Sequence, residues 1–353
     1  MSLSARLLDA WYNDAPWLKA LRPLAWAYQA VITHRSRAYA AGKKRVWKAP
    51  VPVIVVGNIT LGGTGKSPLV AWLAQWLAEQ GWRPGIVSRG YGSAGKTYPL
   101  LVTRDTPVSG CGDEPAMLAA QLDTPLVADP DRPRGARRLL DEGCDILLAD
   151  DGLQHLALGR DIELVVVDGK RGFGNGACLP AGPLREPLSR LERVDAVIVN
   201  GQAQLAMVPE PFHMTLEPLQ WRRLADDRIQ PLTPAPFSSP VHAVAGIGHP
   251  QRFFATLEAL NVPHYAHAFP DHHTFHASDL AFGDRAPVVM TAKDAVKCRD
   301  IVGPDCWVLD VVAAPEAAFV HWLSQRLDAL HDTTDGAPME GGSVSVQTRC
   351  DNG

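Results

Sequence analysis

The sequence predicts an α/β fold: a parallel sheet with helices on both faces, followed by a smaller C-terminal α/β domain. Short apolar runs rich in Val and Ile recur between residues 50 and 200, and helical patterns alternate with them. This alternation is typical of parallel strands that are buried on both faces. Residues 206–240 are proline-rich and lack such periodicity. The alternation returns after residue 240 and continues to about residue 330.

Length and composition fit a folded protein of about two domains. The chain has 353 residues, of which 46% are hydrophobic and 20% charged. Its six cysteines form no C-x-x-C pair, so we expect reduced thiols in a cytosolic setting. No apolar run approaches the length of about 18 residues that a membrane-spanning helix needs, and no secretory signal is evident. A net charge of −4 argues against a general nucleic-acid binder.

These features divide the chain into five predicted parts. They are a basic amphipathic membrane-associating segment (1–48), a domain built around the main sheet (49–205), a linker (206–240), a smaller α/β domain (241–330) and a disordered tail (331–353).

The N-terminal segment combines positive charge with aromatic residues. Residues 1–50 carry nine Lys or Arg against two Asp, a net charge of +7. A helix from about Pro23 would place an apolar face that includes Trp26 and Val31 beside a basic end. Such a helix is typical of the surface of an anionic membrane. The alternative is an amphipathic helix packed on its own domain, with the basic residues simply solvated.

Residues 51–68, VPVIVVGNITLGGTGKSP, read as a buried strand, a glycine-rich loop and the start of a helix. This is the context of a P-loop, in which backbone N–H groups surround the phosphates of a nucleoside triphosphate. Lys66 would reach the β- and γ-phosphates, and the Ser67 hydroxyl would hold Mg²⁺. The predicted nucleotide-binding residues are Thr60, Gly62, Gly63, Thr64, Gly65, Lys66, Ser67 and Pro68. Thr60 departs from the motif, which usually has glycine there; the alternative is an ordinary glycine-rich turn.

Acidic residues follow two other predicted elements. The apolar run 144–149 leads into Asp150 and Asp151, the Walker-B pattern, in which a carboxylate governs Mg²⁺ or its waters. Asp113 and Glu114 open a helix, where they could cap it or act as a base on a hydroxyl.

Basic residues and histidines leave several interpretations open. Arg132 could lie on a solvated helix face or bind phosphate. His272 could lie at the surface or orient a carboxylate from the second domain; a metal site is less favoured, because adjacent histidines rarely share one ion. For His155 we expect a structural role.

Eight segments together resemble the tetraacyldisaccharide 4'-kinase family. They are VGNITLGGTGKSP, SRGYG, GDEP, DDGLQH, GPLRE, AGIGHPQRFF, FPDHH and TAKDAVK, in this order between residues 56 and 297. The resemblance implies phosphorylation of the 4'-hydroxyl of an acylated glucosamine disaccharide 1-phosphate in lipid A biosynthesis. It also implies ATP and Mg²⁺, and a place at the cytoplasmic face of the bacterial inner membrane. Ala292 departs from the family, which usually has Glu there, and Ser67 replaces the commoner Thr.

The resemblance also implies roles for single residues. Asp113 would be the catalytic base and His272 its partner, while Lys66 and Ser67 keep the P-loop roles. The predicted Mg²⁺ environment consists of Ser67, Glu114, Asp150 and Asp151. Arg132 and Arg185 would contact phosphate or the transition state. Two other functions fit the P-loop alone: an ATPase or GTPase switch without a small acceptor, and a soluble small-molecule kinase.

Overall fold

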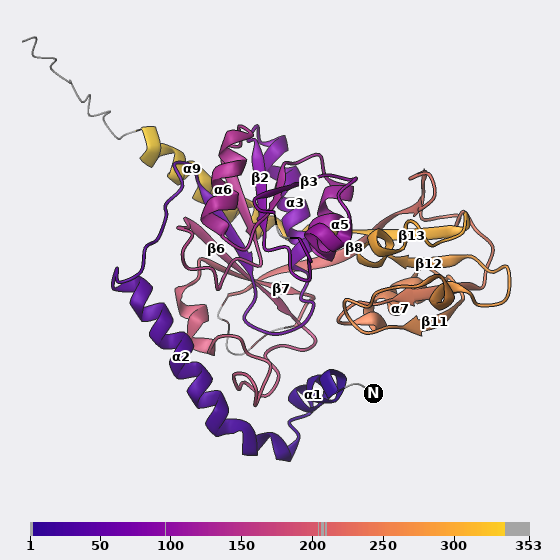
Figure 1. Ribbon diagram of the computed structural model, residues 1–353, viewed down its shortest axis with the longest axis horizontal. Coiled ribbons are helices and arrows are strands. Elements are labelled where there is room, and N and C mark those ends of the chain that lie inside the picture. The colour runs from indigo at the N-terminus through magenta and orange to yellow at the C-terminus, as the bar shows by residue number, and fades with distance from the viewer. Residues whose placement is uncertain (1–2, 96, 204, 206–207, 209, 336–353) are drawn as a thin grey trace, which may run out of the picture. The chain divides into compact units, whose positions relative to one another are not determined.

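The computed structural model in Figure 1 describes residues 3–95, 97–203, 205, 208 and 210–335. It contains two compact units, residues 1–316 and residues 317–353. Of the second unit the structure describes one helix, α9 (Ala317–Asp335). The first unit holds every described strand and all the residues of the predicted site.

The first part of the chain forms helices at the N-terminus and then alternating strands and helices. Its elements are α1 (Leu3–Tyr12), η1 (Pro16–Leu21), α2 (Arg22–Ala40), β1 (Val53–Gly57), α3 (Lys66–Glu79), β2 (Pro84–Ser88), β3 (Leu100–Val102), α4 (Val108–Cys111), α5 (Asp113–Gln121), β4 (Leu126–Ala128), α6 (Arg132–Asp141), β5 (Ile146–Asp150), β6 (Ile162–Asp168), η2 (Leu188–Arg193) and β7 (Ala196–Asn200). The strand expected within residues 51–68 is β1, and the apolar run 144–149 lies largely in β5.

The second part alternates strands and helices again. Its elements are β8 (Phe212–Arg223), β9 (Ile229–Gln230), β10 (Val241–Ala245), α7 (Pro250–Ala259), β11 (His264–Ala268), η3 (Ala277–Leu280), β12 (Val288–Thr291), α8 (Ala292–Cys298) and β13 (Cys306–Pro315).

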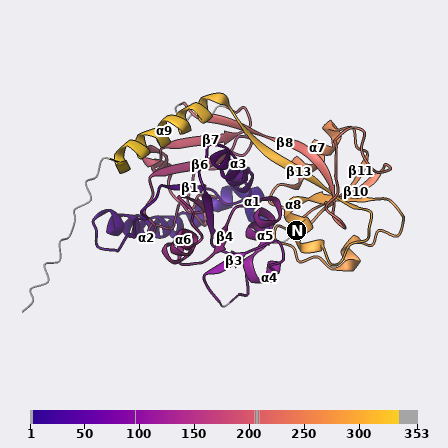
Figure 2. The ribbon, with the colours of Figure 1, turned by 90° about the horizontal axis from the view of Figure 1, so that it is seen from above.

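One sheet runs through both parts, in the order β11-β10-β12-β13-β8-β7-β6-β1-β5-β2-β4-β3, with β9 beside β8. Its neighbours are parallel except at β13/β8, β8/β9 and β4/β3. The long strands β8 and β13 carry the sheet from one part to the other (Figure 2). The α/β class with a mostly parallel sheet is confirmed.

The expected linker, residues 206–240, was wrong in one respect: it contains β8 and β9 rather than irregular chain. The expected disordered tail was wrong at its start, because residues 331–335 belong to α9. The remainder of that tail lies outside the described residues. The division into two domains stays a prediction.

Strand register places the functional loops together. Strand β1 lies between β5 and β6, and Val56 stands opposite Asp150. In parallel strands the carboxyl ends share one edge, so the loop after β1 begins beside the acidic end of β5. On the other side of β6, Asp168 pairs with Asn200 at the end of β7. All five residues of β1 are buried, which fixes this edge within the core.

Candidate active site

The glycine-rich loop has the backbone that a P-loop requires. Gly62 and Gly65 have φ angles of +105° and +99°, in the region that favours glycine. Gly65 precedes the first residue of α3, Lys66. A Cβ atom on Gly65 would lie 2.6 Å from the side-chain nitrogen of Asn200, so a larger residue cannot occupy this position without displacement. Thr60, where the motif usually has glycine, is buried and forms a β-bridge with Leu184.

Lys66 lies at the start of α3 and faces the second residue of the acidic pair. Its Nζ is 3.6 Å from Asp151 Oδ1, and Arg185 Nη1 donates to Asp151 Oδ2 at 2.9 Å. Burial raises the pKa of Asp151, but the charges of Lys66 and Arg185 outweigh it and leave the pKa far below its usual value. Asp151 also has a positive φ of 47°. This ionised carboxylate therefore joins two predicted phosphate-binding cations, from α3 and from the loop before η2.

Asp150 has a different environment from its neighbour. It is buried at the end of β5, and burial, together with the charges of Glu114 and Asp151, raises its pKa to about 7. Its Oδ1 has no hydrogen-bond partner among the described residues. Arg132 Nη2 donates to the backbone oxygen of Asp150 at 2.6 Å, and the Arg132 side chain is fully buried. Burial lowers the pKa of Arg132 to about 10. Arg132 thus binds the backbone of Asp150. A contact between Arg132 and phosphate stays a prediction.

The donor set at this edge fits Mg²⁺. The ion prefers oxygen ligands and binds proteins through one or two carboxylates together with substrate phosphates. The unpartnered Oδ1 of Asp150 supplies such an oxygen, and Ser67 carries a hydroxyl in the first turn of α3. Glu114 is paired with Lys293 at 3.1 Å instead. Within the described ranges, no three His, Cys, Asp or Glu residues form a metal-holding group by themselves.

The structure brings Asp113 and His272 into contact, although 159 positions separate them in the chain. Asp113 is the first residue of α5, and its Oδ2 lies 3.0 Å from His272 Nδ1. The hydrogen bond to Asp113 raises the pKa of His272. Burial raises the pKa of Asp113, but the hydrogen bond from His272 and the charge of Lys297 outweigh it, so the pKa is lowered. The pair therefore holds an ionised carboxylate against an imidazole.

Two lysines of α8 lie beside the acidic residues around Asp113 and His272. We did not predict either lysine as a site residue. Lys293 Nζ lies 3.1 Å from both Glu114 Oε1 and Asp271 Oδ1. Lys297 Nζ lies 3.7 Å from Asp113 Oδ2. Their segment, TAKDAVK, entered only as part of the family resemblance, and a lysine on a short helix is otherwise typical of a solvated surface. Ala292, the departure from the family, is buried at the start of α8.

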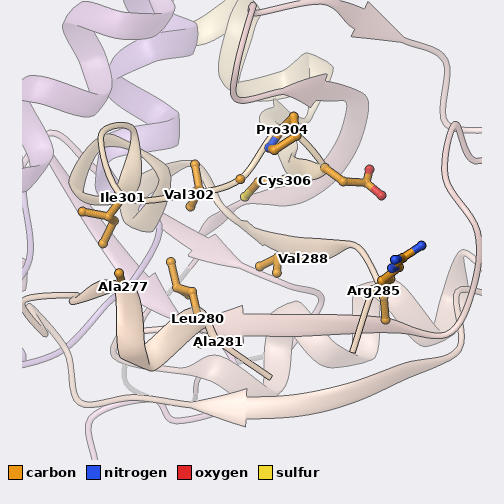
Figure 3. Close-up of a pocket in the computed structure, with 12 residues that line it drawn as sticks. Ala277, Leu280, Ala281, Arg285, Val288, Ile301, Val302, Pro304 and Cys306 are labelled. Carbon is orange, nitrogen blue, oxygen red and sulfur yellow. The ribbon is translucent and has the colours of Figure 1, made fainter. Parts of the chain in front are cut away.

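A cavity of about 540 Å³ lies elsewhere, in the C-terminal part of the first unit. Figure 3 shows Leu280, Val288 and Cys306 facing it, with Arg285 at one end. None of its lining residues belongs to the predicted site, so this cavity is separate from the candidate active site.

Comparison with known proteins decides the family. Residues 17–328 match the model of the tetraacyldisaccharide-1-P 4'-kinase family. The chain belongs to this family. It is 48% identical over 334 residues to the tetraacyldisaccharide 4'-kinase of Pseudomonas aeruginosa, a match over 94% of this chain and 99% of the relative. It is also 48% identical over 331 residues to the enzyme of that name from Azotobacter vinelandii, a match over 94% of this chain and 99% of that relative.

A solved structure agrees with this membership. The fold is similar to LpxK from Aquifex aeolicus in complex with ATP, with a TM-score of 0.76 and 28% identity over 89% of this chain and 99% of that one. The chain is therefore a kinase, which transfers a phosphoryl group from ATP to a hydroxyl. The activity that we expected from the resemblance, ATP-dependent 4'-phosphorylation of the lipid A precursor, is confirmed at the level of the family.

Proposed function

We propose that Asp113 is the base of this reaction and that His272 orients it. The observation that carries the proposal is the 3.0 Å contact between Asp113 Oδ2 and His272 Nδ1 at the start of α5. A hydroxyl that attacks phosphorus must lose its proton, and an ionised carboxylate within hydrogen-bond reach can take it. The bond from the 4'-oxygen to the γ-phosphorus forms as the bond to the β,γ-bridging oxygen breaks, so ADP leaves.

The phosphates would be held at the neighbouring edge of the sheet. Lys66 and Arg185 both form ion pairs with Asp151. Both cations therefore lie beside the P-loop, where they could contact the phosphates of a bound triphosphate. Mg²⁺, when bound, neutralises charge on the phosphates during phosphoryl transfer. Ser67, Asp150 and Asp151 would hold it; Glu114, which pairs with Lys293 at 3.1 Å, remains a predicted member of this set. Fixed charges of this kind supply most of the rate enhancement in phosphoryl transfer.

The test is transfer of labelled γ-phosphate from ATP to detergent-solubilised tetraacyl disaccharide 1-phosphate. Asp113→Ala should lower kcat by about 10²–10⁴ while ATP binding persists, because the base acts on the acceptor and not on the nucleotide. His272→Ala should also lower kcat. His273→Ala is the matched control, because His273 contacts Asp279 and not Asp113.

Two results would contradict the proposal. Full transfer by Asp113→Ala would exclude it as the base. ATP hydrolysis by the wild type without lipid phosphorylation would instead favour a P-loop ATPase.

We further propose that the N-terminal helices attach the enzyme to the cytoplasmic face of the inner membrane. In the described helices no segment is long and apolar enough to cross a bilayer. Helix α2 nevertheless exposes Trp26 and Val31 to 67% and 66%, and Leu24 to 59%. Large apolar side chains beside basic residues are typical of a helix that lies in the membrane interface. An acylated acceptor would reach the enzyme from that surface.

Binding to vesicles that contain anionic phospholipid tests this second proposal. Trp26→Ser combined with Val31→Ser should release the full-length chain from the vesicles. The control replaces Leu219 and Ile229, which are exposed to 54% and 57% on β8 and β9 and lie far from α2 in the sequence. Unchanged binding by the α2 variant, or equal release by the control, would count against attachment through α2.

A further inference from the structure

Three side chains donate hydrogen bonds to consecutive carbonyl oxygens of the P-loop. Arg171 Nη2 donates to the Gly63 oxygen at 3.0 Å, and Asn200 Nδ2 donates to the Thr64 oxygen at 3.0 Å. Asn58 Nδ2 lies 3.4 Å from the Gly62 oxygen, a longer contact. The donors follow or end β1, β6 and β7, three strands that finish at the same edge of the sheet. None of the three was predicted as a site residue.

Because the peptide unit is planar and trans, a donor that fixes a P-loop carbonyl also fixes the direction of the N–H in the same peptide unit. Within one peptide unit the C=O and the N–H point in opposite directions. A donor that fixes the Gly63 carbonyl therefore directs the N–H of Thr64 to the other side of the loop. Asn200 does the same for the N–H of Gly65. In a P-loop, these N–H groups bind the phosphate chain.

We propose that Arg171 and Asn200, assisted by Asn58, are positioning residues that hold the P-loop amides ready for the phosphates of ATP. The inference rests on the kinase function proposed above and adds the side chains that shape its nucleotide loop. It assigns Arg171 to the backbone of the loop, in contrast to Lys66 and Arg185, whose charges are available to the phosphates directly.

Arg171 is itself held rigidly. Its Nε lies 3.4 Å from Asp168 Oδ2, and its guanidinium carbon lies 5.6 Å from the centre of the Tyr12 ring. Only 12% of its side chain is exposed. Its Nη1 has no hydrogen-bond partner among the described residues and lies 3.1 Å from where a Cβ of Gly62 would be. A second donor of the same guanidinium thus remains beside the loop.

Asn200 is equally constrained. It is buried at the end of β7, and Gly65 approaches its side-chain nitrogen so closely that only glycine fits. The amide cannot leave the Thr64 carbonyl without opening the core around it. Both donors are therefore fixed before any nucleotide binds, as preorganised binding requires.

Arg252 offers a matched control for Arg171. Its Nη2 donates to the same oxygen of Asp168 at 3.0 Å, but it does so from α7 and makes no hydrogen bond to the described residues of the P-loop. Arg252→Met removes a cation from Asp168, as Arg171→Met does, and leaves the Gly63 carbonyl with its donor. A difference between the two variants thus reports the contact with the loop.

Isothermal titration of the full-length chain with ATP, and with inorganic tripolyphosphate, tests the proposal. Arg171→Met and Asn200→Leu should each raise Kd for both ligands by about 10- to 100-fold, or about 1.4 to 2.8 kcal/mol. Arg171→Lys should recover part of the loss, because one ammonium can still donate to the carbonyl. Arg252→Met should bind as the wild type does. Thermal unfolding without ligand should be the same for Arg171→Met and Arg252→Met.

Wild-type affinity in both Arg171→Met and Asn200→Leu would overturn the inference, as would an equal loss in Arg252→Met. Asn200→Leu removes one donor group, nearly keeps the shape and adds no charge, so it tests the idea even if Arg171→Met does not fold. A wild-type chain that binds no ATP would overturn the kinase function together with the inference. A wild type that binds ATP beside variants of unchanged affinity would overturn the inference alone.

Discussion

Gly112 is the position from which the placement of Asp113 can be tested most sharply. It precedes α5 with φ 90° and ψ 164°, a conformation that is essentially restricted to glycine. Another residue there costs of the order of 1–3 kcal/mol in backbone strain. A Cβ would also overlap the backbone oxygen of Tyr91. Because that atom belongs to the main chain, a side-chain rotation cannot relieve the overlap, and the start of α5 must move.

We therefore expect Gly112→Ala to lower kcat by about 100-fold, the effect of a misplacement of about 1 Å at a reacting group. ATP affinity should be unchanged, since the P-loop is not displaced. Gly81→Ala is the control: Gly81 also has φ 90°, but no atom lies within 4 Å of its added Cβ. That substitution should cost about 1–2 kcal/mol of stability and leave kcat as it is.

The assay compares kcat for lipid phosphorylation, Kd for ATP and the unfolding temperature Tm in the two variants. Comparable losses of Tm with a loss of kcat confined to Gly112→Ala would support the reasoning. Equal kcat values in the two variants would refute it, since displacement of α5 would then have no effect on the chemistry.

Three further perturbations have expected outcomes. Lys66→Met should lower kcat by about 10²–10³, because a charge that stabilises the transferred phosphoryl group is lost; single-turnover kinetics measure this, and an unchanged rate would contradict it. Arg222→Met should cost about 3–5 kcal/mol, because it removes the cation 2.9 Å from Asp310, between β8 and β13, and leaves this buried carboxylate with only the 3.4 Å contact from Gln220; restoration of Tm by adding Asp310→Leu is the check. Burial and the charges of Arg132 and Arg89 lower the pKa of His155 from 6.5 to about 4. The unfolded chain then binds the proton more readily than the folded chain, so stability is lost as pH falls from about 6.5 to about 4. Between pH 7 and pH 5, Tm should therefore fall less in His155→Gln than in the wild type.

The proline-rich segment shows where sequence patterns misled. Pro218 lies inside β8, opposite Val311, next to a register shift at which Leu219 has no partner. Proline is tolerated in a strand at such a bulge, because no ladder N–H is required there. The prolines therefore indicated a linker although the chain continues as a strand. Only the pairing of β8 with β13 shows that this segment is a strand and not a linker.

The positioning residues were missed for a related reason. Arg171 lies in a loop rich in glycine and arginine, and Asn200 ends an apolar run, so neither stands in a recognisable motif. Their function depends on which carbonyl each one reaches. That is fixed by β6 and β7 ending beside the P-loop, and local sequence does not encode the distance.

The sequence by itself determined the elements around the site and the chemistry at their ends: the P-loop after β1, the acidic pair at the end of β5 and the carboxylates that open α5. These features are local, because an apolar run, a glycine or a capping carboxylate acts on its own neighbours. The tertiary structure decided which distant groups meet. Asp113 contacts His272 only because β8 and β13 continue one sheet into the C-terminal part and bring residues far apart in the chain to one place.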